Sequence, residues 1–183
     1  MSRVIWHFTM SLDGFIAGAE HSMDWVFDAF KNTGPNRLGE EVMNETGAIL
    51  GGRGWYDAAR EKYDGVDGIY GGRWTGPVFV LTHRLTDAPN DPKATFISGA
   101  IEEALATARD AAHGRNVEIF GANVARQCLD AGLIDEIAIH LAPVLLGDGI
   151  RLYGTPAAPR IDLERTLLAT SGAVVDLCFS VRK

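Results

Sequence analysis

The chain lacks most of the features that would place it in a specialised class of protein. Its 183 residues include only two cysteines, Cys128 and Cys178, and both lie in apolar contexts, so we expect reduced core residues and no disulfide framework. No histidine, cysteine or carboxylate cluster has the spacing of a metal site, and we predict no metal. The sequence contains no Gly-x-Ser-x-Gly segment, which leaves a serine hydrolase without support.

Long apolar runs and an excess of positive charge are also missing. No apolar stretch is long enough to span a bilayer, so we expect no membrane segment. Residues 1–5 enter a strand pattern directly, without the apolar segment and cleavage site of a signal peptide, which predicts a cytoplasmic protein. The net charge is −7 with no run of lysine or arginine. We therefore expect no nucleic-acid partner, while a local basic pocket for one phosphorylated ligand stays compatible with the composition.

What is present is the composition of an ordinary globular domain. Hydrophobic residues make up 46% of the chain and charged residues 22%, and 183 residues suit one domain, 1–183, with a sizeable core. Strand patterns alternate with helical spacing through the middle of the chain, and only strand patterns follow at the end. This order predicts an α/β sandwich with a mostly parallel sheet and an antiparallel C-terminal edge.

Hydrophobic periodicity and glycine punctuation place the individual elements. We expect strands over residues 4–10, 15–17, 48–50, 77–81, 95–97, 117–120, 134–141, 163–169 and 173–181. We expect helices over residues 37–45, 55–60, 101–112 and 124–131, with Ser98 capping the third of them. Segments 18–36 and 62–76 have no clear period and are predicted to be loops.

Three of the predicted strand ends are suited to binding an anion. They are Gly52-Arg53-Gly54, Thr82-His83-Arg84 and Gly121-Ala122-Asn123. Glycine lets the backbone approach a ligand, a helix start offers unpaired N–H groups, and arginine donates two parallel hydrogen bonds to a phosphate. Because ligands of an open α/β sheet lie beyond the carboxyl ends of its strands, we expect these turns to share one ligand. For each turn alone, a plain strand-to-helix connection or a solvated turn is the alternative.

Several segments, taken in order, resemble one known family. They are Thr9-Met10-Ser11-Leu12-Asp13-Gly14-Phe15-Ile16-Ala17, Gly52-Arg53-Gly54-Trp55-Tyr56, Gly121-Ala122-Asn123, Asp130-Ala131-Gly132-Leu133-Ile134-Asp135-Glu136 and Ala142-Pro143-Val144-Leu145-Leu146-Gly147-Asp148-Gly149. This set resembles the dihydrofolate-reductase fold, and most closely the reductase domain of the bacterial riboflavin-biosynthesis deaminase-reductase and its stand-alone relatives. The resemblance implies a three-layer sandwich and hydride transfer from NADPH to a small heterocyclic or ribosylamino substrate, such as 5-amino-6-(5-phosphoribosylamino)uracil.

The resemblance also implies roles for the turns at the strand ends. Arg53, between Gly52 and Gly54, and the turn Thr82-His83-Arg84 would hold the adenosine 2′-phosphate of NADPH. Gly121, Ala122 and Asn123 would face the pyrophosphate or the nicotinamide ribose, and Ala17 would approach the nicotinamide. The family often has two glycines where this chain has Phe120-Gly121.

The acid that protonates the substrate is sought among the carboxylates near the N-terminus. Asp13 is one candidate, although it could equally cap the turn at Gly14. Asp28 is another, because Met23-Asp24-Trp25 resembles the Met-Pro-Trp segment that precedes a carboxylate in dihydrofolate reductases. Asp24 is a third. Trp25 could stack on a heteroaromatic substrate, or it could anchor a loop.

Further expectations concern alternatives and assembly. The same fold could reduce dihydrofolate or another imine, or it could bind a nucleotide without catalysis, an alternative that Phe120 favours. His7 and His140 lie on predicted strands, where we expect core or surface packing. Relatives commonly pair through their sheets, which implies a homodimer, and the apolar residues 137–141 and Leu145-Leu146 could serve its interface.

Overall fold

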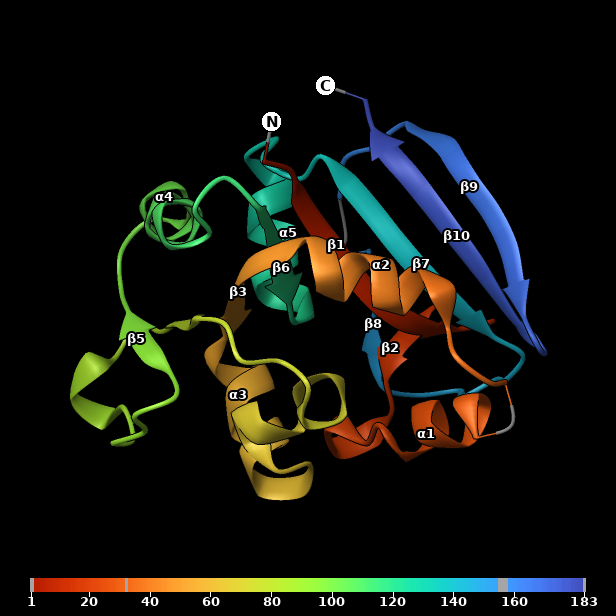
Figure 1. Cartoon of the computed structure of the whole chain (residues 1–183), viewed down its shortest axis with the longest axis horizontal. Helices are drawn as coiled ribbons and strands as arrows, with labels where there is room; N and C mark the ends of the chain where they lie inside the picture. Colours follow the sequence, from red (N-terminus) through yellow and green to blue (C-terminus); the bar gives the residue numbers. More distant parts are fainter. Residues whose placement is uncertain (1, 32, 155–157, 183) are drawn as a thin grey trace.

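The protein is built on one twisted sheet whose strands lie in the order β5-β4-β3-β6-β1-β7-β10-β9 (Figure 1). The computed structural model describes residues 2–31, 33–154 and 158–182. The strands of this sheet are β1 (Val4–Ser11), β3 (Thr46–Gly52), β4 (Val78–Leu81), β5 (Thr95–Ile97), β6 (Asn116–Phe120), β7 (Glu136–Ala142), β9 (Leu163–Ser171) and β10 (Val174–Val181). The neighbours from β5 to β7 are parallel, whereas β10 and β9 are antiparallel, which confirms the predicted sheet.

Helices cover both faces of the sheet and give the three layers expected for the fold. They are α1 (Asp24–Phe30), α2 (Arg37–Glu45), α3 (Arg53–Lys62), α4 (Ile101–Ala111) and α5 (Ala122–Asp130). Strand side chains alternate between faces. Val4 and Trp6 pack in the cluster that contains α4 and α5, whereas Ile5 between them packs with Leu38 and Val42 of α2.

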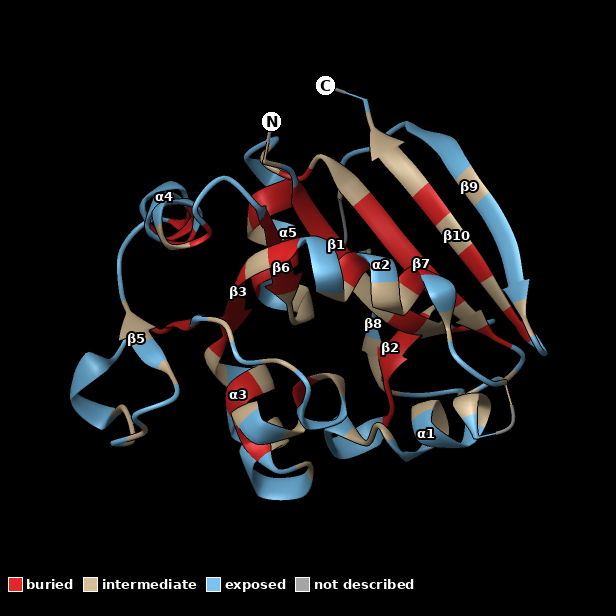
Figure 2. Ribbon diagram, in the orientation of Figure 1, coloured by how far each residue is buried: buried red, intermediate tan, exposed pale blue. Residues whose placement is uncertain are grey.

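The core is densest in the middle of the sheet. Strands β3, β4 and β6 are buried on both faces, and β3 and β6 are red in Figure 2. This burial explains their nearly continuous apolar sequences. On the α3 side, Ile49 packs with Tyr56 of α3 and with Val80 of β4. The edge strand β9 is mostly exposed. The rigid centre of the sheet therefore carries the strand ends that hold the candidate site.

Both segments predicted to be loops contain short helices. Segment 18–36 holds the 3₁₀ turn η1 (Ala19–His21) and helix α1. Helix α1 buries no residue, so it had no apolar period to reveal it. Segment 62–76 holds η2 (Gly65–Gly72), which is kinked because Tyr70 and Gly71 adopt left-handed backbone angles. The cap predicted at Ser98 is also wrong, since Ala100 precedes α4.

Two smaller expectations are settled by burial. Cys128 and Cys178 are 0% and 5% exposed, and burial raises the pKa of their thiols to about 12 and about 11, so both are protonated core residues. Ile137 and Ile139 of β7 are buried in the chain's own core, whereas Leu145 is 69% exposed. Within the described ranges, every helix is too short or too polar to cross a membrane.

Candidate cofactor and substrate site

A cavity of about 1070 Å³ lies where β4, β3 and β6 end, and the predicted cofactor residues line it. The lining includes Ala17, Gly52, Arg53, Gly54, Thr82, His83, Arg84, Gly121, Ala122 and Asn123. Strands β4, β3 and β6 are adjacent and parallel, so the turns that follow them meet at one edge of the sheet. The topology therefore brings together three turns that lie far apart in the sequence.

Two helices begin at this edge with glycine as the N-cap residue. Gly52 precedes α3 and Gly121 precedes α5, and neither has a side chain with which to cap the first N–H groups. Gly121 has a φ of 84°, a conformation that disfavours other residues, and a Cβ at this position would lie 3.1 Å from Cβ of Trp55. Both helix starts thus present unpaired N–H groups and positive dipole charge to the cavity.

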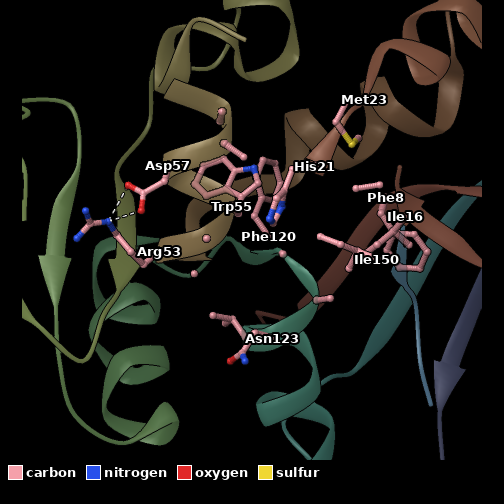
Figure 3. A pocket seen from close by; sticks show the side chains of 18 of the residues that line it. Phe8, Ile16, His21, Met23, Arg53, Trp55, Asp57, Phe120, Asn123 and Ile150 are labelled. Atoms are coloured by element: carbon pink, nitrogen blue, oxygen red, sulfur yellow. Dashed lines mark hydrogen bonds and ion pairs between the residues drawn. The ribbon is translucent and has the colours of Figure 1, made fainter. Parts of the chain in front are cut away.

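The basic end of the cavity is formed by Arg53 and the turn after β4. Nε of Arg53 donates to both carboxylate oxygens of Asp57, at 2.7 and 2.9 Å, and this pair lies at one side of Figure 3. Arg84 is more available, because its side chain is 81% exposed and its contact with Asp87 is a 3.6 Å ion pair. The backbone N–H of Arg84 donates to the Thr82 hydroxyl, which fixes the turn.

The opposite end of the cavity is apolar. Phe8, Ile16 and Ile150 gather there, on the far side of Trp55 from Arg53 (Figure 3). Residues Ile150–Arg151 form strand β8, which pairs with β2 (Phe15–Ala17). A Cβ at Gly149 would lie only 2.1 Å from the Ala17 carbonyl oxygen, so this pairing needs a glycine there. The lining between the two ends includes Trp55, whose ring packs edge-to-face on Phe120.

The carboxylates proposed as acids lie outside this lining. Asp13 accepts hydrogen bonds from the Ser11 hydroxyl and from the backbone N–H groups of Leu146 and Gly147. The bond from Ser11 contributes most to a pKa of about 2, so Asp13 is ionised and anchors the 146–147 turn. Asp28 is exposed on α1. Neither residue is positioned to protonate a substrate in this cavity.

Trp25 also lies outside the lining, although its neighbours Met23, Val26 and Phe27 are part of it. The indole Nε1–H of Trp25 donates to the Ser22 carbonyl at 3.2 Å. This contact ties α1 to the turn before it, as in the loop-anchor alternative.

A row of buried polar side chains, which the sequence did not reveal as a site, forms part of the cavity wall. Glu118 of β6 contacts His7 of β1, His7 contacts His140 of β7, and His140 contacts Asp176 of β10. We call these four residues the polar stripe. The contact distances along the stripe are 3.0, 2.7 and 2.6 Å. Glu118, His7 and His140 line the cavity together with Tyr70 of η2.

Sheet register explains why the polar stripe forms. The strands β6, β1, β7 and β10 are consecutive neighbours, and Asp176 pairs directly with His140. Ile5 lies opposite Glu118 and Thr9 lies opposite His140, so His7, two residues from each on β1, shares their face. The one local signal was Glu118, a carboxylate inside an otherwise buried strand pattern.

Hydrogen bonds compensate the burial of Asp176. Burial alone would raise the pKa of Asp176, but hydrogen bonds from His140, Ser171 and Asn36 outweigh it and hold the pKa below its usual value. Burial lowers the pKa of His140, and the neighbouring His7 adds to this effect. The two groups are therefore ionised carboxylate and neutral imidazole, joined by a 2.6 Å hydrogen bond.

The three-layer α/β sandwich, with parallel strands from β5 to β7 and antiparallel β10 and β9 at one edge, matches the dihydrofolate-reductase-like class of folds. Within this class, residues 2–175 match the RibD C-terminal domain family, and the chain belongs to that family.

Similar proteins agree with this placement. The uncharacterized protein YwjB of Bacillus subtilis is 28% identical over 159 residues, which cover 82% of each chain. The structure of a putative riboflavin biosynthesis protein from Shewanella sp. PV-4 superimposes with a TM-score of 0.80, at 21% identity and full coverage of both chains. Dihydrofolate reductase from Enterococcus faecalis, in a complex with NADP(H), has a TM-score of 0.62 at 11% identity, with 99% of this chain and 97% of that chain covered.

Proposed function

We propose that the protein is an NADPH-dependent reductase that transfers a hydride to a small heterocyclic or ribosylamino substrate. The observation that carries the proposal is the meeting of three separate turns, Gly52–Gly54, Thr82–Arg84 and Gly121–Asn123, in the lining of one cavity. Membership of the RibD C-terminal domain family supports it. The cavity volume of about 1070 Å³ is at the upper end of ligand pockets and suits a dinucleotide together with a small substrate.

The chemistry of the three turns fits the parts of NADPH. Arg84, His83 and Arg53 form the basic end of the cavity and would hold the 2′-phosphate. The helix starts at Gly52 and Gly121 would receive the pyrophosphate, because their N–H groups have no side-chain cap. When bound, the cofactor would supply the hydride. The protein would orient the two reactants and exclude water from them.

The substrate would occupy the remaining part of the cavity, between the apolar end and the polar stripe. Arg151 lines this region and lies over the Phe15 ring at 4.6 Å, which makes it the candidate partner for a substrate phosphate. A ribosylamino pyrimidine phosphate, such as 5-amino-6-(5-phosphoribosylamino)uracil, combines a flat polar ring, a reducible sugar carbon and a phosphate. The polar ring would contact the polar stripe, the reducible carbon would face the cofactor, and the phosphate would contact Arg151.

The two alternatives have less support in the site. Reduction of dihydrofolate would use a carboxylate from the first helix, but Asp28 is exposed and outside the cavity lining. A non-catalytic nucleotide-binding domain is favoured by Phe120 in place of a glycine. Phe120, however, packs on Trp55 and leaves Gly121 with the positive φ of an uncapped helix start.

Calorimetry and turnover together test the proposal. We expect NADPH to bind with a dissociation constant of about 1–10 μM, or about −7 to −8 kcal/mol, and NADH to bind at least about tenfold more weakly. Loss of reduced-nicotinamide absorbance with the ribosylaminopyrimidine, and none with dihydrofolate, would separate the substrates. If neither NADPH nor NADH binds with a dissociation constant below about 1 mM, the proposed reductase activity is wrong. Binding without turnover of any compound in a broad panel would favour the non-catalytic domain.

The homodimer stays a prediction. Exposed Leu145, and Leu168 on the edge strand β9, are apolar surface that a partner copy could cover, with exposed fractions of 69% and 59%. Light scattering coupled to size exclusion should give twice the mass of the 19.8 kDa chain. A mass equal to that of one chain at high protein concentration would contradict the predicted homodimer.

A further inference from the structure

The polar stripe contains more hydrogen-bond contacts than neutral rings and ionised carboxylates can satisfy. Each short contact between two nitrogen or oxygen atoms requires a hydrogen between them. A neutral His140 has one ring hydrogen, and its contact with Asp176 uses that hydrogen on Nδ1. The 2.7 Å contact between the two Nε2 atoms must then take the only ring hydrogen of a neutral His7.

No ring hydrogen is left for the other nitrogen of His7. Its Nδ1 atom lies 3.0 Å from Oε1 of Glu118 and 2.9 Å from the Tyr70 hydroxyl, while that hydroxyl lies 2.7 Å from the same Oε1. The hydroxyl has a single hydrogen for two partners. A lone pair on Nδ1 would therefore face a carboxylate lone pair at 3.0 Å, inside the protein.

One additional proton gives every contact a donor, because an N–H at Nδ1 of His7 is shared between Oε1 of Glu118 and the Tyr70 oxygen while the Tyr70 hydroxyl donates to Oε1. Placed on Nδ1 of His7, it makes that ring an imidazolium and leaves the four residues of the stripe with a net charge of −1. Glu118 is 0% exposed, and a buried carboxylate without a compensating charge is costly, so a cation beside it is favoured. The neutral form that burial imposes on His140 directs the proton to the His7 end, which lines the cavity.

We propose that the polar stripe is the proton source of the reductase, with His7 as the acid that protonates the substrate and with Glu118, His140 and Asp176 as positioning residues. The identity of the proton acceptor rests on the proposed function. The presence of the proton does not, because it follows from the contacts of the stripe alone.

The reaction balances with this single proton. The substrate carbon of a C=N or C=O bond gains the hydride and forms a C–H bond, and the π-electron pair moves to the nitrogen or oxygen. That atom forms an N–H or O–H bond with the proton that leaves Nδ1 of His7, where the N–H bond breaks, and loss of the hydride would oxidise NADPH to NADP⁺. The imidazole becomes neutral and the charge of the stripe changes from −1 to −2. Because this state leaves the Glu118 carboxylate without its cation, the stripe takes a proton from solvent before the next turnover.

The polar groups that contact His7 each come from a different element of the fold. Glu118 comes from β6, His140 from β7 and Tyr70 from η2, with Asp176 behind His140 on β10. Burial, together with Glu118, raises the pKa of Tyr70, so this hydroxyl keeps its proton. Arg73 donates to the Tyr70 carbonyl and pairs with Glu40, outside the stripe.

Imidazole nitrogen NMR on the full-length protein tests the proton without any ligand. At pH 7 we expect one histidine with both ring nitrogens protonated and coupled across the Nε2–Nε2 contact, assigned by its absence in His7→Gln. Glu118→Gln removes the neighbouring charge and should leave both rings neutral. Should that variant not fold, Asp176→Asn should shift the same signals in the same direction. Neutral His7 and His140 in the wild type at pH 7 would overturn the proposal.

Turnover of NADPH with 5-amino-6-(5-phosphoribosylamino)uracil tests the transfer. His7→Gln should lower kcat by about 100-fold and flatten its pH profile, while NADPH affinity measured by calorimetry changes less than about twofold. His113→Asn, at an exposed position two residues beyond α4, is the matched control and should keep wild-type kcat. A His7→Gln enzyme within about threefold of wild type would overturn the proposal. If the wild type does not bind NADPH, the proposed function fails, and the imidazole spectra alone decide whether the stripe holds its proton.

Discussion

The two candidate functional regions of this protein, the turns proposed to bind the cofactor and the polar stripe, are assembled in opposite ways. The cofactor turns are local segments of three residues, each following a buried strand, and the parallel topology brings them to one edge. The polar stripe takes single residues from β6, β1, β7 and β10, separated by up to 133 positions in one contact, and depends on sheet register to align them. The turns are partly exposed and face solvent, whereas the stripe is buried. The first region is thus suited to recognise a charged ligand and the second to hold a proton away from water.

The largest expected effect comes from breaking the stripe. Glu118→Ala removes the buried carboxylate that His7 and Tyr70 contact, which breaks the network, and should lower the free energy of unfolding by about 3–5 kcal/mol. Urea unfolding followed by far-UV circular dichroism measures this loss. Glu61→Ala, at an exposed position of α3, should change it by less than about 0.5 kcal/mol. A loss below about 1 kcal/mol for Glu118→Ala would mean that the stripe is not an ionised network.

The contrast between the regions also explains what could be predicted from the sequence. Strand β5 and nine of the ten residues proposed to bind the cofactor followed from local signals, namely apolar runs that end in glycine or a polar turn, whereas Ala17 came from the family resemblance. The polar stripe did not, because His7 and His140 are unremarkable within their own strands and acquire partners only through the pairing of β1 with β7. Helix α1 was missed because it has no buried face, and Asp28 was placed by resemblance to a segment whose surroundings differ.

The next largest effect concerns the cofactor turns. Arg84→Ala removes a charge-assisted contact to the 2′-phosphate and should weaken NADPH binding by about 10- to 100-fold, or about 1.5–3 kcal/mol, without changing NADH binding. Calorimetric titration with both nucleotides measures the difference. Arg37→Ala is the matched control, because Arg37 is exposed, pairs with Glu41 and lies outside the cavity. If the affinities for NADPH and NADH fall equally, this turn does not contact the 2′-phosphate.

Two glycines with positive φ separate an effect on the cavity from an effect on stability. Gly121→Ala and Gly132→Ala both place a side chain at positive φ, at 84° and 65°, and each should cost about 1–2 kcal/mol of stability. Only the first adds a Cβ beside Trp55 in the cavity, since nothing lies within 4 Å of a Cβ at Gly132. We expect NADPH affinity to fall for Gly121→Ala alone, by roughly tenfold. Equal affinities of the two variants would contradict a pyrophosphate at the start of α5.

The smallest expected effect is the response of the stripe to acid. The folded-state pKa of His140 is depressed by burial, so its contribution to stability is present above its unfolded value of 6.5 and is lost as pH falls. The pKa of Asp176 is also lowered in the folded state by its hydrogen bonds. Its contribution to stability is therefore lost as the pH falls below the unfolded pKa of 3.8. Because the protonated His7 proposed above gains stability over the range in which His140 loses it, the net decrease of the urea midpoint is expected below pH 4, where the Asp176 contribution is lost. A midpoint that rises as the pH falls below 4 would contradict this direction.

A crystal structure of the protein with NADP⁺ bound is the most direct test of the central claim that three distant turns hold one dinucleotide. We expect the 2′-phosphate against Arg84 and His83, the pyrophosphate at the helix start after Gly121, and the nicotinamide ring beside Ala17, on the side of the cavity that leads to His7. Electron density for the cofactor in any other part of the molecule, or an adenosine ribose turned away from Arg84, would contradict the account.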